Sequence, residues 1–109
     1  MNYSYAEYVP IFKAVSDETR LKIIDMLSCG AMCACDILVE FSISQSTLSY
    51  HMKTLMESGL VNGVREGTWM RYTLNTEKMN EVLSFIKEIT AEKENCICKT
   101  IKKDECDNK

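Results

Sequence analysis

Residues 44–59, "SQSTLSYHMKTLMESG", hold the pattern that decides the fold. Apolar residues recur there at three- and four-residue intervals, which predicts an amphipathic helix between an N-cap serine and a terminal glycine. The expected buried positions are Leu48, Met52 and Leu55. The opposite side carries short polar side chains, which suit the major groove of DNA. A solvated helix face is the ordinary alternative for such a pattern.

The segments before this helix predict its partner in a helix-turn-helix. "SDETRLKIIDMLSCG" (residues 16–30) predicts a helix that Ser16 caps and Gly30 ends. Its expected inward stripe is Leu21, Ile24 and Leu27, widened by Ile23 and Met26. A third helix is expected from about Met32 to Phe41, with Ile37, Leu38 and Phe41 inward. The connector "SIS" then gives helix-turn-helix spacing.

The segments outside this pair complete a winged helix. "LVNGVREGTWMRYTL" (residues 60–74) predicts a hairpin with one buried face, because Met70, Tyr72 and Leu74 alternate with Trp69, Arg71 and Thr73. Residues 3–14 predict a short first helix, and about Thr76 to Lys93 a last one. The expected apolar stripe of the last helix is Met79, Val82, Leu83, Ile86 and Ile89, with Phe85 at its edge.

These elements predict a mainly α fold with a β-hairpin wing, a winged helix-turn-helix. We expect one domain over residues 1–93 and a polar, cysteine-containing, loosely ordered tail over 94–109. The net charge of −3 is uneven, since residues 44–74 carry three basic and two acidic side chains, +1 in all, and the remainder carries −4. A small basic face on an acidic body is therefore compatible with DNA binding. The candidate DNA contacts are Gln45, Ser46, Thr47, Ser49, Tyr50, Lys53, Arg65 and Arg71.

The chain contains six cysteines and one histidine, residue types that can serve as metal ligands. No signal peptide or membrane-spanning run is visible, so we expect a cytoplasmic protein without a membrane partner and with reduced thiols. In "SCGAMCACDIL" (residues 28–38), Cys33 and Cys35 are two residues apart, a spacing that a regular helix would point to nearly opposite sides. Taken alone, the pair could be small buried hydrophobes. We expect His51 to pack or hydrogen-bond rather than to bind a ligand.

The blocks "DETRLKIIDML", "CACDIL", "SQSTLSYHMKTLMESGLV" and "REGTWMRYTL" together resemble the ArsR/SmtB family of winged-helix metalloregulators, over about residues 11–75. The resemblance implies a homodimeric transcriptional repressor, paired through its first and last helices, that releases double-stranded operator DNA when an effector binds. "CACD" resembles the "CxCD" segment of arsenic-responsive members, which implies Cys33 and Cys35 as thiolate ligands of trivalent arsenic or antimony. No permanent cofactor is expected. The histidine-containing zinc site of other members has no counterpart, because the last helix lacks histidine.

The resemblance also leads to expectations about the third ligand of the metalloid and about how metalloid binding affects DNA binding. Many arsenic-responsive members have a third cysteine where this chain has Leu38, so another thiol is needed; in order of preference the candidates are Cys96 or Cys98, then Cys29, then Cys106. Binding of the metalloid by Cys33 and Cys35 should distort the first turn of the third helix. This should shift the DNA-recognition helix of residues 44–59. The helix N-terminus should lower the thiol pKa values.

Three alternatives stay open beside this interpretation. A winged helix of this kind could sense another soft metal, such as cadmium or lead, or thiol oxidation, in which a tail cysteine would pair with one of the two thiols. A thiol metal-buffer protein without a DNA role is more remote. An enzyme is not expected, since the chain has no "CxxC" and no nucleotide-binding loop.

Overall fold

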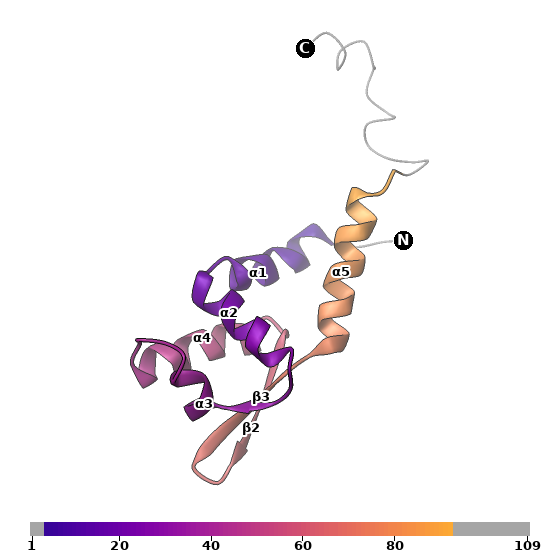
Figure 1. Ribbon diagram of the computed structural model, residues 1–109. Coiled ribbons are helices and arrows are strands. Elements are labelled where there is room, and N and C mark those ends of the chain that lie inside the picture. The colour runs from indigo at the N-terminus through magenta and orange to yellow at the C-terminus, as the bar shows by residue number, and fades with distance from the viewer. Residues whose placement is uncertain (1–3, 93–109) are drawn as a thin grey trace.

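The computed structural model describes residues 4–92, and within them the chain forms a winged helix-turn-helix (Figure 1). The helices are α1 (Tyr5–Val15), α2 (Glu18–Leu27), α3 (Ala34–Leu38), α4 (Gln45–Glu57) and α5 (Thr76–Thr90). The strands are β1 (Met32–Cys33), β2 (Val61–Glu66) and β3 (Trp69–Leu74), paired antiparallel in the order β1-β3-β2. The expected fold class is thereby confirmed. The tail at residues 94–109 lies outside the described residues.

Helix α4 matches its prediction in both its ends and its buried face. The Ser44 side chain accepts a hydrogen bond from the backbone N–H of Thr47 at 3.1 Å, which satisfies one of the free donors in the first turn. Gly59 follows the helix with φ +86°, a conformation that favours glycine. Leu48, Met52 and Leu55 are all buried, at 2% exposure or less.

The hairpin of β2 and β3 also follows its alternating pattern. Arg65 is paired with Met70 and Glu66 with Trp69, and Gly67 occupies the turn with φ +64°. Tyr72 is buried and Met70 and Leu74 are half-buried, whereas Trp69, Arg71 and Thr73 are exposed. One face of the hairpin therefore packs on the helices and the other faces outward.

The expected third helix is wrong at both ends. Met32 and Cys33 form the short strand β1, which pairs with Tyr72 and Arg71 of β3, and α3 spans only Ala34–Leu38. Pairing with β3 gives the backbone of residues 32 and 33 hydrogen-bond partners that a longer helix would otherwise supply. Inside the short helix, Ile37 is fully buried and Leu38 is half-buried against the core; Phe41, beyond the end of the helix, is also half-buried there.

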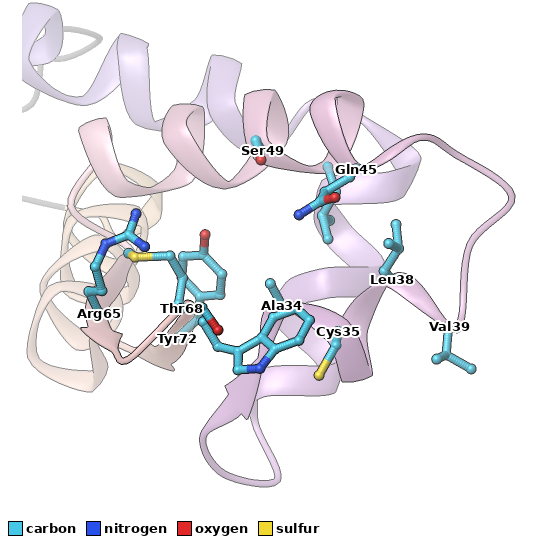
Figure 2. A pocket seen from close by; sticks show the side chains of 12 residues that line it. Ala34, Cys35, Leu38, Val39, Gln45, Ser49, Arg65, Thr68 and Tyr72 are labelled. Atoms are coloured by element: carbon cyan, nitrogen blue, oxygen red, sulfur yellow. The ribbon is translucent and has the colours of Figure 1, made fainter.

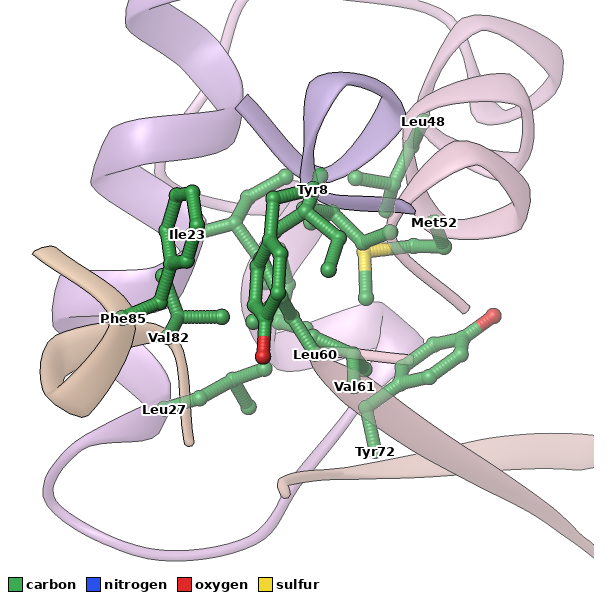
Figure 3. Packing of buried hydrophobic residues seen from close by; sticks show 13 residues of the cluster. Tyr8, Ile23, Leu27, Leu48, Met52, Leu60, Val61, Tyr72, Val82 and Phe85 are labelled. Carbon is green, nitrogen blue, oxygen red and sulfur yellow. The ribbon is translucent and has the colours of Figure 1, made fainter. Parts of the chain in front are cut away.

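The hydrophobic core joins every helix to the hairpin (Figure 3). Ile23, Ile37, Met52 and Leu55 have no exposed surface, and Leu60 and Val61 are buried where α4 leads into β2. The rings of Tyr8 and Phe85 stack with their centroids 3.9 Å apart and their planes at 4°, so α5 is docked on α1. Stacked aromatic pairs stabilise a fold by more than the burial of their surface area alone.

Two expected helix faces and one expected cap need correction. Asp17, not Ser16, caps α2 by accepting from the backbone N–H of Arg20, while the Ser16 hydroxyl donates to the carbonyl of Phe12 at 2.6 Å. Leu21 is 54% exposed, and the buried stripe of α2 is centred on Ile23 and Leu27. In α5, Phe85 and Val82 are buried. Leu83, Ile86 and Ile89 are exposed, because α1 covers only one side of the predicted stripe.

Candidate functional site

The two neighbouring thiols meet at the junction of β1 and α3. Cys33 is the N-cap residue of α3 with an extended backbone (φ −85°, ψ 158°), and Cys35 belongs to the first turn. Their Sγ atoms lie 2.6 Å apart. The expectation that the local structure separates the sulfurs is wrong, because Cys33 is outside the helix. No unwinding of a helical turn is needed to bring them together.

Asp36 adds an oxygen to this thiol pair. Its Oδ2 lies 3.3 Å from the Cys33 Sγ, and its Oδ1 lies 4.0 Å from the Cys35 Sγ. One ligand atom from each of Cys33, Cys35 and Asp36 falls within 4.8 Å of the others, a spacing that could hold a metal ion. Sequence reasoning missed Asp36, although the signal was present: the acid follows the second thiol directly in "CACD".

The electrostatics of this group differ from the expectation. The hydrogen bond with Cys33 raises the pKa of the Cys35 thiol, and desolvation and the negative charges of Cys33 and Asp36 act in the same direction. The predicted lowering by a helix N-terminus is therefore wrong for Cys35. Helix α3 has only five residues, and two acidic groups adjoin the thiol.

The other predicted thiol ligands are not part of this group. Cys29 is exposed, just beyond the end of α2, and is absent from the Cys33–Cys35–Asp36 cluster. Cys96, Cys98 and Cys106 lie outside the described residues. The side chain of Leu38, at the position of the missing third cysteine, lines a cavity beside the thiol pair.

All eight predicted DNA contacts are exposed. Six lie along α4 and two on the hairpin: Gln45, Ser46, Thr47, Ser49, Tyr50, Lys53, Arg65 and Arg71. Thr47 also takes part in the cap, since the hydroxyl of Ser44 donates to its Oγ1 at 3.0 Å. Arg71 on β3 is paired with Cys33 on β1, which sequence reasoning did not anticipate.

A cavity of about 500 Å³ lies between α3, α4 and the hairpin (Figure 2). Cys35 and Leu38 line it from α3, Gln45 and Ser49 from α4, and Arg65 with several hairpin residues from the opposite side. Trp69 and Tyr72 of β3 are among these hairpin residues. The thiol group and part of the predicted DNA face therefore border the same space.

No helix among residues 4–92 is long and apolar enough to cross a membrane.

Comparisons with known proteins agree with this geometry. Residues 17–63 match the family described as "Bacterial regulatory protein, arsR family". The arsenical resistance operon repressors of Staphylococcus aureus and Staphylococcus xylosus are 41% and 43% identical to the chain over 103 residues, covering 94% of it and 99% of each relative. The solved structure of an ArsR-like transcriptional regulator from Rhodococcus sp. RHA1 superposes with a TM-score of 0.70 at 29% identity, covering 79% of this chain and 81% of that one. All three are named as regulators, and none as an enzyme.

Proposed function

The chain belongs to the arsR family of bacterial regulatory proteins, and we propose that it is a repressor that leaves its operator when trivalent arsenic or antimony binds Cys33 and Cys35. One observation carries the proposal. The two thiol sulfurs lie 2.6 Å apart where β1 meets α3, and Cys33 belongs to β1, a strand of the same sheet as the wing. An effector bound there would lie beside Arg71, which is paired with Cys33 and is one of the predicted DNA contacts.

The chemistry of trivalent arsenic suits this thiol pair. Thiolates select soft acceptors, and a pyramidal arsenic centre takes its ligands from one side. In water the acceptor is neutral As(OH)₃, and each As–S bond forms as a thiol proton leaves with an arsenic-bound hydroxide as water. No net proton is released, so the raised pKa of Cys35 does not oppose capture. The names of the staphylococcal relatives support an arsenical as the effector.

A third ligand completes the pyramidal centre. We propose Cys96 or Cys98 first, then Cys29, then Cys106, as thiols from beyond the Cys33–Cys35 pair. Asp36 stands beside the pair as an oxygen donor. Its carboxylate is a hard ligand, which suits arsenic less well than a third thiolate does.

The DNA interface is proposed to be the exposed face of α4 together with the wing. Gln45, Ser49 and Tyr50 would face base edges in the major groove, with Ser46, Thr47 and Lys53 on bases or phosphates. Arg65 and Arg71 would contact the sugar-phosphate backbone from the hairpin. The arsR family supports double-stranded operator DNA as the partner.

The effect of effector binding would be transmitted to the DNA interface through the sheet as well as through α3. Binding fixes the side-chain torsions of Cys33 and Cys35, and Cys33 is paired across the β1–β3 ladder with Arg71. A shift of β1 therefore moves the wing directly. A shift of α3 also moves the connector to α4. In a dimer the two recognition helices must match half-sites about 34 Å apart, so small rotations of either element weaken binding.

Homodimerisation through α1 and α5 is also proposed. Five large apolar side chains on these two helices are exposed in the single chain: Tyr5, Val9, Leu83, Ile86 and Ile89. The Tyr8–Phe85 stack holds the two helices together, so these residues belong to one packed unit. Exposed apolar groups that gather on neighbouring elements favour a protein partner.

The test is an arsenite titration of the reduced protein on labelled DNA from upstream of its own gene, followed by fluorescence anisotropy. We expect release from the wild type and none from the Cys33→Ser, Cys35→Ser double variant. Ala34→Ser is the matched control, because it places a hydroxyl between the two cysteines and removes no thiol. Release from the double variant equal to that from the wild type would overturn the proposal.

A soft divalent cation, cadmium or lead, is the second candidate, and Asp36 favours it by offering a carboxylate oxygen beside two sulfurs. A cation binds the thiolates, so its capture releases protons and strengthens as pH rises toward the raised pKa of Cys35. The same titration with cadmium at several pH values separates the two. If cadmium releases the DNA and arsenite does not, and if this release increases with pH, then cadmium rather than arsenic is the effector.

A further inference from the structure

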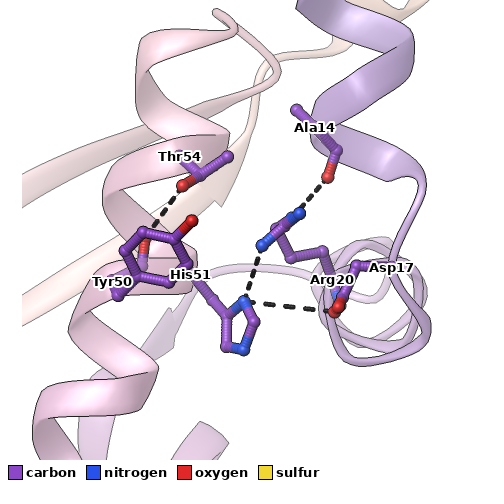
Figure 4. Close-up of polar contacts among 6 residues, drawn as sticks. All are labelled: Ala14, Asp17, Arg20, Tyr50, His51 and Thr54. Carbon is purple, nitrogen blue, oxygen red and sulfur yellow. Dashed lines mark hydrogen bonds and ion pairs between the residues drawn. The ribbon is translucent and has the colours of Figure 1, made fainter.

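We infer that Arg20 and His51 are positioning residues that hold the recognition helix α4 in its DNA-binding orientation, and that they do so only while His51 is neutral. The inference rests on the proposed function, since it concerns binding of operator DNA. It starts from a hydrogen-bonded cluster of Arg20, His51 and Asp17 that joins α4 to α2 and to the end of α1 (Figure 4).

Arg20 lies at the centre of the cluster. Its Nε donates to the carbonyl oxygen of Ala14 in the last turn of α1 at 2.5 Å, and its Nη1 lies 2.8 Å from the Nδ1 of His51 on α4. Its backbone N–H donates to the Asp17 cap at 3.1 Å. One side chain therefore links three helices.

This geometry fixes the state of the imidazole. A guanidinium has five N–H donors and no acceptor, so the Nδ1 of His51 must accept and carry no hydrogen. The neutral ring then carries its hydrogen on Nε2. The side chain of His51 is only 12% exposed, which limits how far water can replace the Arg20 contact.

Protonation of His51 would break this link. A proton on Nδ1 removes the acceptor and places a positive charge next to the Arg20 guanidinium. The Asp17 carboxylate, whose Oδ2 lies 4.0 Å from the same nitrogen, would draw the charged ring toward the start of α2. On α4 itself, the Tyr50 ring lies 5.6 Å from the imidazole, centroid to centroid. Arg20 and Asp17 are thus the charged groups that face His51, and they pull it in opposite directions.

The cluster can control the rotation of α4 about its own axis, because the apolar packing of α4 defines this rotation less well. Met52 and its buried neighbours fix the depth of the helix in the core, but apolar contacts have little directional preference. A charge-assisted hydrogen bond is directional. Residue 51 is followed by buried Met52 and preceded by exposed Tyr50, a predicted DNA contact, so a rotation about this point moves the DNA face.

The sign of the pH effect separates this inference from simple electrostatics. Adding a proton makes the protein more positive, which by itself strengthens binding to DNA phosphates. If His51 positions α4, acidification weakens binding instead. His51 is the one histidine in the chain, so the wild type and variants of this single residue are compared over the same range, from about pH 8 to about pH 5.5.

The experiment measures operator affinity by fluorescence anisotropy across that pH range, without effector, for the wild type, His51→Asn and His51→Leu. An asparagine places its Oδ1 near the position of Nδ1 and does not titrate. We expect wild-type affinity to fall about tenfold on acidification, the size of one lost charge-assisted hydrogen bond. His51→Asn should bind like the neutral wild type at every pH. His51→Leu should bind about as weakly as the acidified protein at every pH.

The single imidazole also gives a readout that does not depend on DNA. Nitrogen-15 NMR should find the Nε2–H tautomer at neutral pH in the wild type, and a change of that population in Arg20→Met. Wild-type affinity that rises in acid, or a pH profile that His51→Asn leaves unchanged, would overturn the inference while leaving the repressor proposal intact. Loss of selective DNA binding by the wild type at neutral pH would instead overturn the repressor proposal, and this inference with it.

Discussion

At the scale of single residues, the thiol pair owes its geometry to a change of backbone conformation between Cys33 and Cys35. Cys33 is extended and Cys35 is helical, so the sulfurs converge where a continuous helix would separate them. The same closeness raises the pKa of Cys35, and the largest cause is its hydrogen bond to Cys33, which stabilises the protonated thiol.

Replacing Cys33 by alanine should therefore lower the pKa of Cys35. The variant removes both the hydrogen bond and the neighbouring negative charge, so a larger fraction of Cys35 is thiolate at a given pH below its pKa. The check is the rate of alkylation at Cys35 against pH, measured by peptide mass spectrometry, with exposed Cys29 as the internal reference. An unchanged or slower rate at Cys35 would show that the two side chains are not coupled in this way.

At the scale of elements, the capped start of α4 has a role in stability and a proposed role in DNA binding. The Ser44 side chain caps the helix whose first residues are Gln45 and Ser46, both predicted DNA contacts. Ser44→Ala should cost about 1 kcal/mol of stability, the usual effect of losing such a cap, and should weaken DNA binding because the first turn frays.

Urea unfolding at one fixed protein concentration measures the stability change, since a dimer's stability depends on concentration. Ser42→Ala is the matched control. It removes an exposed serine hydroxyl two residues earlier that does not cap α4. Equal losses in the two variants would argue against the cap as the cause.

The same scale shows what the sequence could and could not predict. Helix α4 and the hairpin were predictable because their buried positions follow one unbroken period, 3.6 or 2. Strand β1 was not, since it has two residues and exists through pairing with β3, some forty residues later in the chain. Without β1, the segment from Met32 to Phe41 fits a helix, which would place the two thiols on opposite sides.

The other differences between the predicted and the observed structure have a similar cause. Ser16 and Asp17 are both good N-cap residues, and the choice between them depends on one residue of register. Leu21 and Phe85 show that periodicity finds an apolar stripe but not which edge of it another element covers. The two cysteines of the site could be named from the sequence. Their contact, the part of Asp36 and the pairing with Arg71 needed the tertiary structure.

At the scale of the whole molecule, the exposed apolar residues of α1 and α5 predict a dimer that a single charge should disrupt. Ile86 is 37% exposed and lies between Leu83 and Ile89 on the proposed interface. Ile86→Glu should shift the protein toward monomer in sedimentation velocity. It should also weaken operator binding, because the two half-site contacts are then no longer linked.

Ser84→Glu supplies the matched control for this prediction. It introduces the same charge two residues earlier, on nearly the opposite side of α5 and away from the proposed interface. It should leave both the dimer and DNA binding unchanged. Equal dissociation of the two variants would mean that the proposed face is not the interface.

The central claim is that Cys33 and Cys35 together hold the effector, and arsenic-edge X-ray absorption tests it most directly. The spectrum of the reduced protein with one equivalent of arsenite reports the number and type of atoms bound to arsenic. We expect a sulfur shell in the wild type that loses the two sulfurs of Cys33 and Cys35 in the Cys33→Ser, Cys35→Ser double variant, with oxygen in their place. The same sulfur shell in both proteins would place arsenic on other thiols and contradict the claim.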